Sequence, residues 1–124
     1  MSKVTPDSIV IDGVTYVPES KAKEKAESFK DLKYCIVRSV GSGAWAGYVK
    51  SKKEGNVVML KARRIWYWDG AASLSQLAIN GTSKPSTCKF PVEVAEVEID
   101  QVVEVIPATK EAQESINSVA IWSA

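Results

Sequence analysis

The fold class of this chain is decided by residues 34–62, YCIVRSVGSGAWAGYVKSKKEGNVVMLKA. Runs of β-branched and aromatic residues alternate there with short stretches rich in Gly, Ser and Lys. The pattern predicts strands at 34–40, 45–51 and 57–62, a Gly-rich turn at 41–47 that leads into the second strand, and a turn at 52–56. Residues 62–68, ARRIWYW, form a fourth run of strand-forming residues. Strands of this length joined by tight turns are typical of a small twisted barrel or sheet of the SH3 or Sm kind.

The N-terminal part has a different texture. Residues 9–17, IVIDGVTYV, place Asp12-Gly13 between two β-rich runs, which predicts a hairpin with a tight type I′ turn. The following SKAKEKAESFKDLK, residues 20–33, is rich in Lys and Glu with almost no apolar stripe, so it is either a solvated helix or a linker. We therefore assign residues 1–30 to a hairpin and a polar segment, and residues 31–124 to one mostly-β ligand-binding domain.

The remaining elements complete an α+β fold that is mainly β. Ser73 and Gln76 form a capping-box pattern and Asn80-Gly81 is a stop signal, which predicts a helix at 74–80 followed by a loop at 82–91. Residues 93–107 alternate acidic and apolar side chains, as in a half-buried strand or hairpin with an acidic outer face. The inner face would carry Val97, Ile99, Val103 and Val105. A second short helix follows Pro107, and an apolar segment ends at Trp122.

Composition excludes several classes of protein. A length of 124 residues suits a single domain, and 16 basic against 15 acidic residues give a net charge of +1, which argues against binding to DNA or RNA polymers. No apolar run approaches the roughly 20 residues that a membrane helix needs. The N-terminus, MSKVTPDS, lacks the apolar core of a signal peptide, so we expect a cytoplasmic protein without a membrane partner.

The chain also lacks the residues of common catalytic sites. It has no histidine, which excludes His-based triads, zincin motifs and His general bases. Cys35 and Cys88 are far apart and belong to no CxxC motif, so they are either two inert reduced thiols or a disulfide or redox pair. We expect no catalytic residue, no metal and no cofactor, although a small hydrolase that uses Asp69 or a Glu as base stays a rival interpretation.

The residues with binding chemistry gather in 62–78, ARRIWYWDGAASLSQLA. Strand alternation would place Arg64, Trp66 and Trp68 on one face, where an indole can stack on a base and a guanidinium can bind phosphate. The amides at the start of the following helix favour an anion. We predict a nucleotide site made of Arg63, Arg64, Trp66, Trp68, Gly70, Ser73, Ser75, Gln76 and Lys84. The alternative is that the tryptophans belong to the core or to a protein interface, and that DGAASLSQ only caps a helix.

The segment from residue 33 to residue 124, with RRIWYWxGAASLSQLA as its specific part, resembles a family of small, mostly uncharacterised proteins encoded in bacteriophage genomes. Small phage proteins of this kind include the anti-CBASS sponges, oligomers that sequester the cyclic dinucleotides made by bacterial immune cyclases. The resemblance implies an immune-evasion protein that binds a cyclic dinucleotide without cleaving it, as a homo-oligomer, dimer or tetramer, in the cytoplasm of the infected host. The alternative is a structural or protein-interaction module without a small-molecule ligand.

Overall fold

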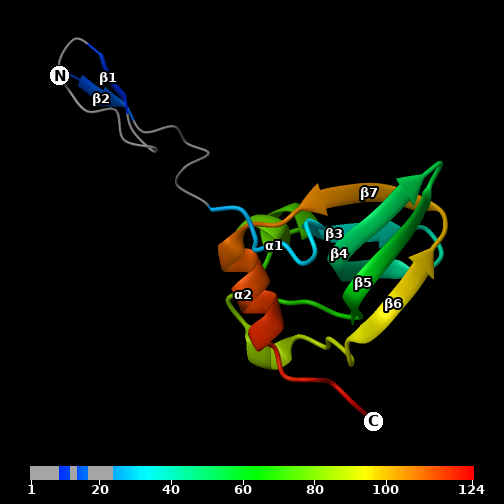
Figure 1. The fold of residues 1–124 in the computed structure, drawn as a ribbon. Helices are drawn as coiled ribbons and strands as arrows, with labels where there is room; N and C mark the ends of the chain where they lie inside the picture. Colours follow the sequence, from blue (N-terminus) through cyan, green and yellow to red (C-terminus); the bar gives the residue numbers. More distant parts are fainter. Residues whose placement is uncertain (1–8, 12–13, 17–23) are drawn as a thin grey trace.

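The computed structural model describes residues 9–11, 14–16 and 24–124, and Figure 1 shows how the elements are arranged. The main body combines one five-stranded antiparallel sheet with two short α-helices. This confirms the mainly β, α+β fold class. The strands are β3 (Tyr34–Ser39), β4 (Gly43–Lys53), β5 (Asn56–Ile65), β6 (Val94–Ile99) and β7 (Val102–Pro107); the helices are α1 (Leu74–Asn80), α2 (Lys110–Ser118) and the 3₁₀ turn η2 (Pro85–Thr87).

The predicted N-terminal hairpin is present as a separate two-stranded sheet. Strand β1 (Ile9–Ile11) pairs antiparallel with β2 (Val14–Tyr16), and Ile11 lies opposite Val14. The turn at residues 12–13 lies outside the described residues, so the predicted turn type stays a prediction.

The main sheet has the strand order β6-β5-β4-β3-β7, and the short connection between its two edge strands requires the sheet to curl. Strands β6 and β7 lie at opposite edges, yet only Asp100 and Gln101 connect them. Three peptide units span about 11 Å, whereas four strand spacings cover about 19 Å, so the two edges must approach each other at this end. The result is an open, strongly curved sheet, as the expectation of a twisted barrel or sheet implied. The hairpin alternative for residues 93–107 is wrong, because β6 and β7 do not pair with each other.

Strands β4 and β5 are longer than predicted and their turn is shorter. Glu54 and Gly55 both have positive φ, 50° and 81°, which suits a two-residue I′ turn, and pairing resumes at Asn56. At the other end β4 begins at Gly43, so the predicted turn at 41–47 is wrong beyond residue 42. Gly-rich sequence suggested a turn there, but pairing with β3 and β5 on both sides holds these residues in a strand.

The predicted fourth strand at 62–68 is also wrong. Residues 62–65 complete β5, and the chain then leaves the sheet. The reason is that Ile65 pairs with Ala44, beyond which β4 has only Gly43, so β4 offers no partner to Tyr67 and Trp68. Trp66 and Tyr67 instead donate their backbone N–H groups to the carbonyl oxygen of Lys89, at 3.1 and 3.2 Å.

Two hydrophobic clusters hold the body together, one on each face of the curled sheet. The first joins the sheet to both helices and to the loop before β6, with Ile36, Leu77, Phe90 and Ile116 fully buried. The second fills the inside of the curl and contains Val37, Trp45, Val57, Met59, Ala62 and Ile99. Neighbouring side chains of β3 point to opposite faces of the sheet, so this strand contributes residues to both clusters.

Alternation in residues 93–107 follows the prediction at three of four positions. Ile99 is buried and Val97 and Val105 are half-buried against the second cluster, but Val103 is 52% exposed. Its exposure has a cause in the register, because Arg38 pairs with Glu104 and Ser39 with Val102, which leaves Val103 as the extra residue of a bulge.

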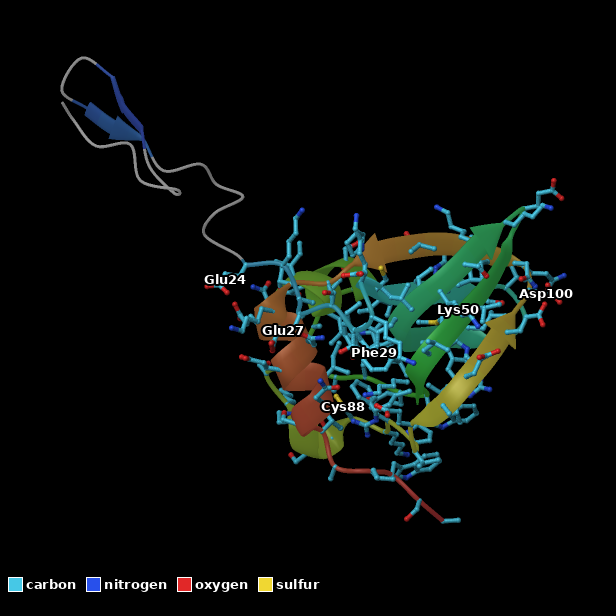
Figure 2. All side chains as sticks on the ribbon, in the orientation of Figure 1. Glu24, Glu27, Phe29, Lys50, Cys88 and Asp100 are labelled. Atoms are coloured by element: carbon cyan, nitrogen blue, oxygen red, sulfur yellow. The ribbon has the colours of Figure 1, made fainter. Side chains whose placement is uncertain are left out.

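Residues 24–33 dock on the body, contrary to the expectation that this segment has no surface for doing so. Ala26 donates its N–H to the carbonyl of Ala108 at 3.2 Å, and the backbone of Glu27 exchanges two hydrogen bonds with the Gln113 amide, at 2.8 and 2.9 Å. The ring of Phe29 packs against Tyr48 with centroids 5.4 Å apart. Figure 2 shows Glu27 beside α2 and Phe29 over the sheet. The segment forms no helix.

Both predicted helices are confirmed. Helix α1 occupies 74–80, the hydroxyl of Ser73 accepts the N–H of Gln76 at 3.2 Å, and Gly81 ends the helix with a φ of 75°. Helix α2 follows Pro107 and is capped in the same way by Thr109. None of the helices in the described part of the chain has the length and apolar character that crossing a membrane requires.

Candidate functional site

Arg64 and Trp66 line one surface cavity together with the turn before β4. The cavity has a volume of about 240 Å³. It forms because β4 pairs with β5 so that Trp45 lies opposite Arg64, which brings the turn beside the end of β5. Its lining residues are Gly41, Ser42, Gly43, Ala44, Arg64, Ile65 and Trp66.

The guanidinium of Arg64 is held in place at this cavity. Its Nη1 donates to the carbonyl oxygen of Ser42 at 2.6 Å, and its central carbon lies 4.1 Å from the ring centroid of Trp45. The Trp45 indole is 6% exposed, and its Nε1 is the buried side-chain N or O atom without a partner in the part of the chain that the structure describes. This single bond and the stacking leave further N–H donors of Arg64 for an anion.

Trp66 presents a free aromatic surface beside Arg64. Its side chain is 62% exposed, and its ring stacks on that of Trp122, with centroids 6.3 Å apart and planes 7° from parallel. Trp122 is positioned by its backbone N–H, which donates to the carbonyl of Phe90 at 3.0 Å. The ammonium of Lys89 lies 5.6 Å from the Trp122 ring and 5.9 Å from the Tyr67 ring. We call Trp66, Tyr67, Lys89 and Trp122 the aromatic surface.

Arg63, which the sequence placed in the ligand set, is instead part of the core. It is 6% exposed, and burial lowers the pKa of its guanidinium. Its nitrogens donate to backbone carbonyls of the loop before β6 and of the C-terminal segment. The acceptors are Phe90, Pro91, Ile116, Val119 and Ala120, at distances from 2.7 to 3.4 Å. Arg63 therefore holds in place the two segments that carry Lys89 and Trp122.

Trp68 and Gly70 are also occupied by internal contacts. The Trp68 ring packs on the first cluster, and its Nε1 donates to the carbonyl of Ala71 at 3.2 Å. The N–H of Gly70 donates to the carboxylate of Asp69 at 2.9 Å. A Cβ on Gly70 would lie 2.5 Å from the backbone N of Lys84, so the 82–84 loop covers this position.

The other predicted site residues surround the start of α1. Ser73 caps the helix, and the side-chain oxygen of Gln76 accepts the N–H of Ala72 at 2.6 Å. Ser75 and Lys84 are exposed, and none of these four residues lines the cavity of Arg64 and Trp66. Of the nine predicted residues, the structure thus brings Arg64 and Trp66 together at one cavity.

The candidate catalytic and redox groups have structural contacts. The carboxylate of Asp69 accepts hydrogen bonds from the Gly70 N–H and the Thr87 hydroxyl, at 2.9 and 3.2 Å. Cys35 and Cys88 are free and buried, and burial raises the pKa of the Cys35 thiol, which favours the unreactive thiol form. Among the described residues no group of three His, Cys, Asp or Glu side chains is placed to hold a metal ion.

Sequence reasoning missed the contribution of the Gly41–Gly43 turn, which it treated as a plain hairpin turn. The sequence contained a signal that could have located this turn. If strand partners are counted residue by residue from the Glu54-Gly55 turn, Ala44 falls opposite Ile65, which places the turn before β4 beside the end of β5. The simple count agrees with the structure because the bulge in β4 and the bulge in β5 each add one residue and cancel. By contrast, no local pattern announced the contact of Trp66 with Trp122, since 55 residues separate them.

The fold and this cavity define a small α+β protein with a cation and an exposed aromatic ring at one surface site. The chain belongs to the family described as a domain of unknown function (DUF6948), whose model matches residues 32–116. Membership of an uncharacterised family, expected from the sequence, is thereby confirmed. The match includes Arg64 and Trp66 and ends before Trp122. No curated protein and no solved structure matches the chain.

Proposed function

We propose that this protein binds a nucleotide at the cavity of Arg64 and Trp66. The observation that carries the proposal is that a fixed guanidinium and a largely exposed indole line the same cavity. A guanidinium forms charge-assisted hydrogen bonds with phosphate, and an indole stacks on any base. Stacking and phosphate binding at adjacent points are what a nucleotide requires.

The surroundings support this assignment of roles. A Cβ added to Gly43 would meet nothing within 4 Å, so a phosphate has room to approach the backbone of the turn. Trp122 supports one face of the Trp66 ring, and the opposite face would receive the base. Lys89, held near two rings of the aromatic surface, adds a second positive charge.

In its finer form, we propose a bacteriophage immune-evasion protein that sequesters a cyclic dinucleotide in the cytoplasm of the infected host without cleaving it. The RRIWYWxGAASLSQLA segment supplies both Arg64 and Trp66, and the absence of histidine from the sequence suits binding without turnover. A cavity of about 240 Å³ lies below the roughly 300–1,000 Å³ of common ligand pockets. Each chain would hold one base and one phosphate, which suits a dimer or tetramer.

The direct test measures binding of cyclic dinucleotides, linear dinucleotides and mononucleotides by calorimetry to the wild type, Arg64→Ala and Trp66→Ala. We expect each variant to stay folded and to lose about ten- to a hundredfold in affinity, the effect of one charge-assisted bond or one stacked base. Arg38→Ala is the matched control, since Arg38 is an exposed arginine on β3 that pairs with Glu104. Unchanged affinity of Arg64→Ala for every ligand of the wild type would rule out this site.

Sequestration and cleavage are separated by recovering the ligand. The cyclic dinucleotide is incubated with the protein, the protein is denatured, and the supernatant is analysed by chromatography. Intact ligand in full yield supports a sponge, and a linear or mononucleotide product supports the rival hydrolase.

The second candidate function is a protein-interaction module, and the exposure of the aromatic surface favours it. Trp66, Tyr67 and Trp122 are 62%, 50% and 43% exposed, and exposed apolar groups that gather at one place often mark an interface. A thermal-shift screen against nucleotides and other metabolites distinguishes the two. Stabilisation by nucleotides supports the first function, whereas no stabilisation by any metabolite, together with a protein partner lost in Trp66→Ala, supports the second.

A further inference from the structure

Strand β7 has an open side that no other strand in the described residues covers. It pairs with β3 along one side and lies at the edge of the sheet. Near its start, the Val102 N–H donates to the carbonyl of Gly55 at 2.9 Å, which joins β7 to the tip of the β4–β5 hairpin. Beyond this point the described part of the chain provides no strand partner for the open side of β7.

The direction of the backbone groups on β7 follows from the register. The Ala108 N–H donates to the Tyr34 carbonyl, so bonded pairs with β3 alternate from there and include Ile106 and Glu104. Val105, which lies opposite Val37, falls in a non-bonded pair. Its N–H and C=O therefore point away from β3, toward the open side, where an added strand can bond them.

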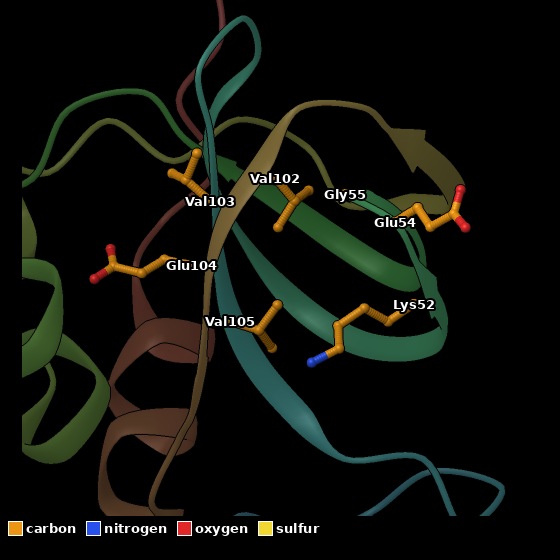
Figure 3. A pocket seen from close by; sticks show the side chains of 7 residues that line it. All are labelled: Lys52, Glu54, Gly55, Val102, Val103, Glu104 and Val105. Carbon is orange, nitrogen blue, oxygen red and sulfur yellow. The ribbon is translucent and has the colours of Figure 1, made fainter.

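A groove runs beside this open side. One cavity of about 260 Å³ lies at the Val102 end, between Lys52, Glu54 and Gly55 of the β4–β5 hairpin and residues 102–105 of β7. Figure 3 shows the Lys52 side chain reaching toward Val105, whereas the Glu54 carboxylate points away from β7. A second cavity of about 340 Å³ lies at the Pro107 end. Lys52 and Val105 line both, so the two cavities adjoin. The second is lined by Asp31, Leu32, Lys33, Cys35, Val49, Lys52, Val105 and Pro107.

Charged residues stand at both ends of the groove. Glu54 lines the Val102 end, and Lys33 lines the Pro107 end with Asp31 beside it. Glu104 is already paired with Arg38 at 2.9 Å. A second β7 laid antiparallel about a two-fold axis at Val105 would bring the Glu54 end of each copy opposite the Lys33 end of the other. The groove is thus complementary to itself in backbone hydrogen bonding and in the pairing of Glu54 with Lys33, while Lys52 is an unmatched charge near the axis.

We infer that β7 is a dimerisation edge, on which the β7 strand of a second copy pairs antiparallel and extends two sheets into one. The paired Val105 residues would exchange N–H···O=C bonds, and the exposed Val103 of each copy would meet the Pro107 end of the other. The inference is independent of the proposed nucleotide site, because no residue of the Arg64 and Trp66 cavity lines this groove.

The test measures the dimer dissociation constant of the full-length chain by sedimentation velocity over a concentration series. We expect a wild-type dimer and a loss of about tenfold or more in Val105→Pro, which removes the outward N–H. Circular dichroism shows whether this variant is folded. A wild type that is monomeric at every concentration, or a folded Val105→Pro with an unchanged dissociation constant, overturns the inference.

Charge exchange tests the geometry without altering the backbone, so it stands even if Val105→Pro fails to fold. Glu54→Lys and Lys33→Glu should each weaken their own homodimer several-fold, because each creates two like-charged contacts. Mixed one to one, the two variants should recover wild-type affinity, since both contacts of the heterodimer join opposite charges. Glu96→Lys, the same change on edge strand β6, is the matched control and should leave the dimer unchanged. A mixture no tighter than its components contradicts the two-fold pairing.

A substitution of Lys52 should strengthen the dimer, whereas the variants above should weaken it. It lines both cavities beside Val105, so two copies of Lys52 would stand nearest the axis and repel each other. Lys52→Met keeps the apolar stem and removes the charge, and we expect it to tighten the dimer several-fold. A weaker dimer in Lys52→Met argues against an axis at Val105.

Discussion

Arg63 and Val119 are joined by a buried hydrogen bond of 2.9 Å from the guanidinium Nη1 to the backbone carbonyl, which ties strand β5 to the residue that follows helix α2. The same nitrogen also bonds the carbonyl of Ile116 at 3.0 Å. The other terminal nitrogen of the guanidinium, Nη2, donates to the carbonyl oxygen of Phe90. One side chain therefore positions both the loop that carries Lys89 and the C-terminal segment that carries Trp122. Arg63 therefore acts on the candidate site through its scaffold.

Removal of this cation should destabilise the fold strongly. We expect Arg63→Met to lower the free energy of unfolding by about 3 kcal/mol or more, because buried carbonyls lose charge-assisted donors. Urea denaturation followed by circular dichroism measures the change. Arg38→Met is the control: Arg38 is half exposed in an ion pair with Glu104, so its loss should cost less than about 1 kcal/mol. Equal urea midpoints for the two variants would refute the structural role of Arg63.

Two glycines with similar backbone angles should respond differently to alanine. Gly43 and Gly70 have φ values of 76° and 82°, so alanine is strained at both by about 1 kcal/mol. A Cβ at Gly43 meets nothing within 4 Å, whereas at Gly70 it would lie 2.5 Å from the Lys84 nitrogen. We therefore expect Gly70→Ala to cost about 1–3 kcal/mol more than Gly43→Ala in thermal unfolding. Equal losses would mean that the 82–84 loop moves aside freely.

Two N-terminal deletions of different length should differ in their effect on the free energy of unfolding. Deletion of residues 1–23 leaves the docked residues 24–33 in place and is the reference for the longer deletion. Deletion of residues 1–30 removes the hydrogen bonds to Ala108 and Gln113 and the Phe29 ring, so we expect a loss of about 2–3 kcal/mol. Chemical denaturation of both deletions measures the difference. We also predict that residues 1–30 are dispensable for nucleotide affinity, because the predicted site residues all lie beyond residue 62, and calorimetry on the same proteins checks this.

The fold should lose stability at alkaline pH through buried phenols. Burial raises the pKa of Tyr34 and of Tyr48 above the ordinary tyrosine value of about 10. A folded pKa above the unfolded one gives stability that is complete below the unfolded value and is lost as pH rises above it. Between about pH 10 and 11, Tyr34→Phe should therefore lose stability less steeply than the wild type, by up to about 1.4 kcal/mol per pH unit. Tyr67→Phe, on the exposed aromatic surface, is the control. Parallel curves for Tyr34→Phe and the wild type would contradict the assignment.

Local signals predicted several elements well because the residues that determine them are near neighbours in the chain. Ser73 and Gln76 stand three positions apart and define the start of α1. Gly81 ends the helix because it adopts a positive φ that glycine tolerates. The β-rich runs around 34–40 and 57–62 became β3 and much of β5 for the same reason. Alternation failed at Val103, where a bulge shifts the phase, since a bulge depends on the partner strand as well as on the residue itself.

The candidate site was predictable only in part. Arg64 and Trp66 were recognised from their chemistry, and the structure places them at one cavity. The residues around α1 were added because the amides at a helix start favour an anion, and none of them lines this cavity. Trp68 was added because the strand was expected to continue to residue 68, but β5 ends at Ile65, opposite the second residue of β4. The end of a strand in a sheet is set by its neighbours, so the propensities of the WYW segment could not show it.

Arg63 and Arg64 show most clearly what the sequence determined and what only the tertiary structure decided. Alternation along a strand, a local property, already requires the two side chains to point to opposite faces. Which face becomes the core was decided by α2 and the C-terminal segment, whose carbonyls at residues 116 and 119 lie 53 and 56 positions away from Arg63 in the chain. Those contacts cover Arg63 and leave Arg64 beside the cavity, because a polar side chain is buried only where distant backbone groups satisfy its hydrogen bonds.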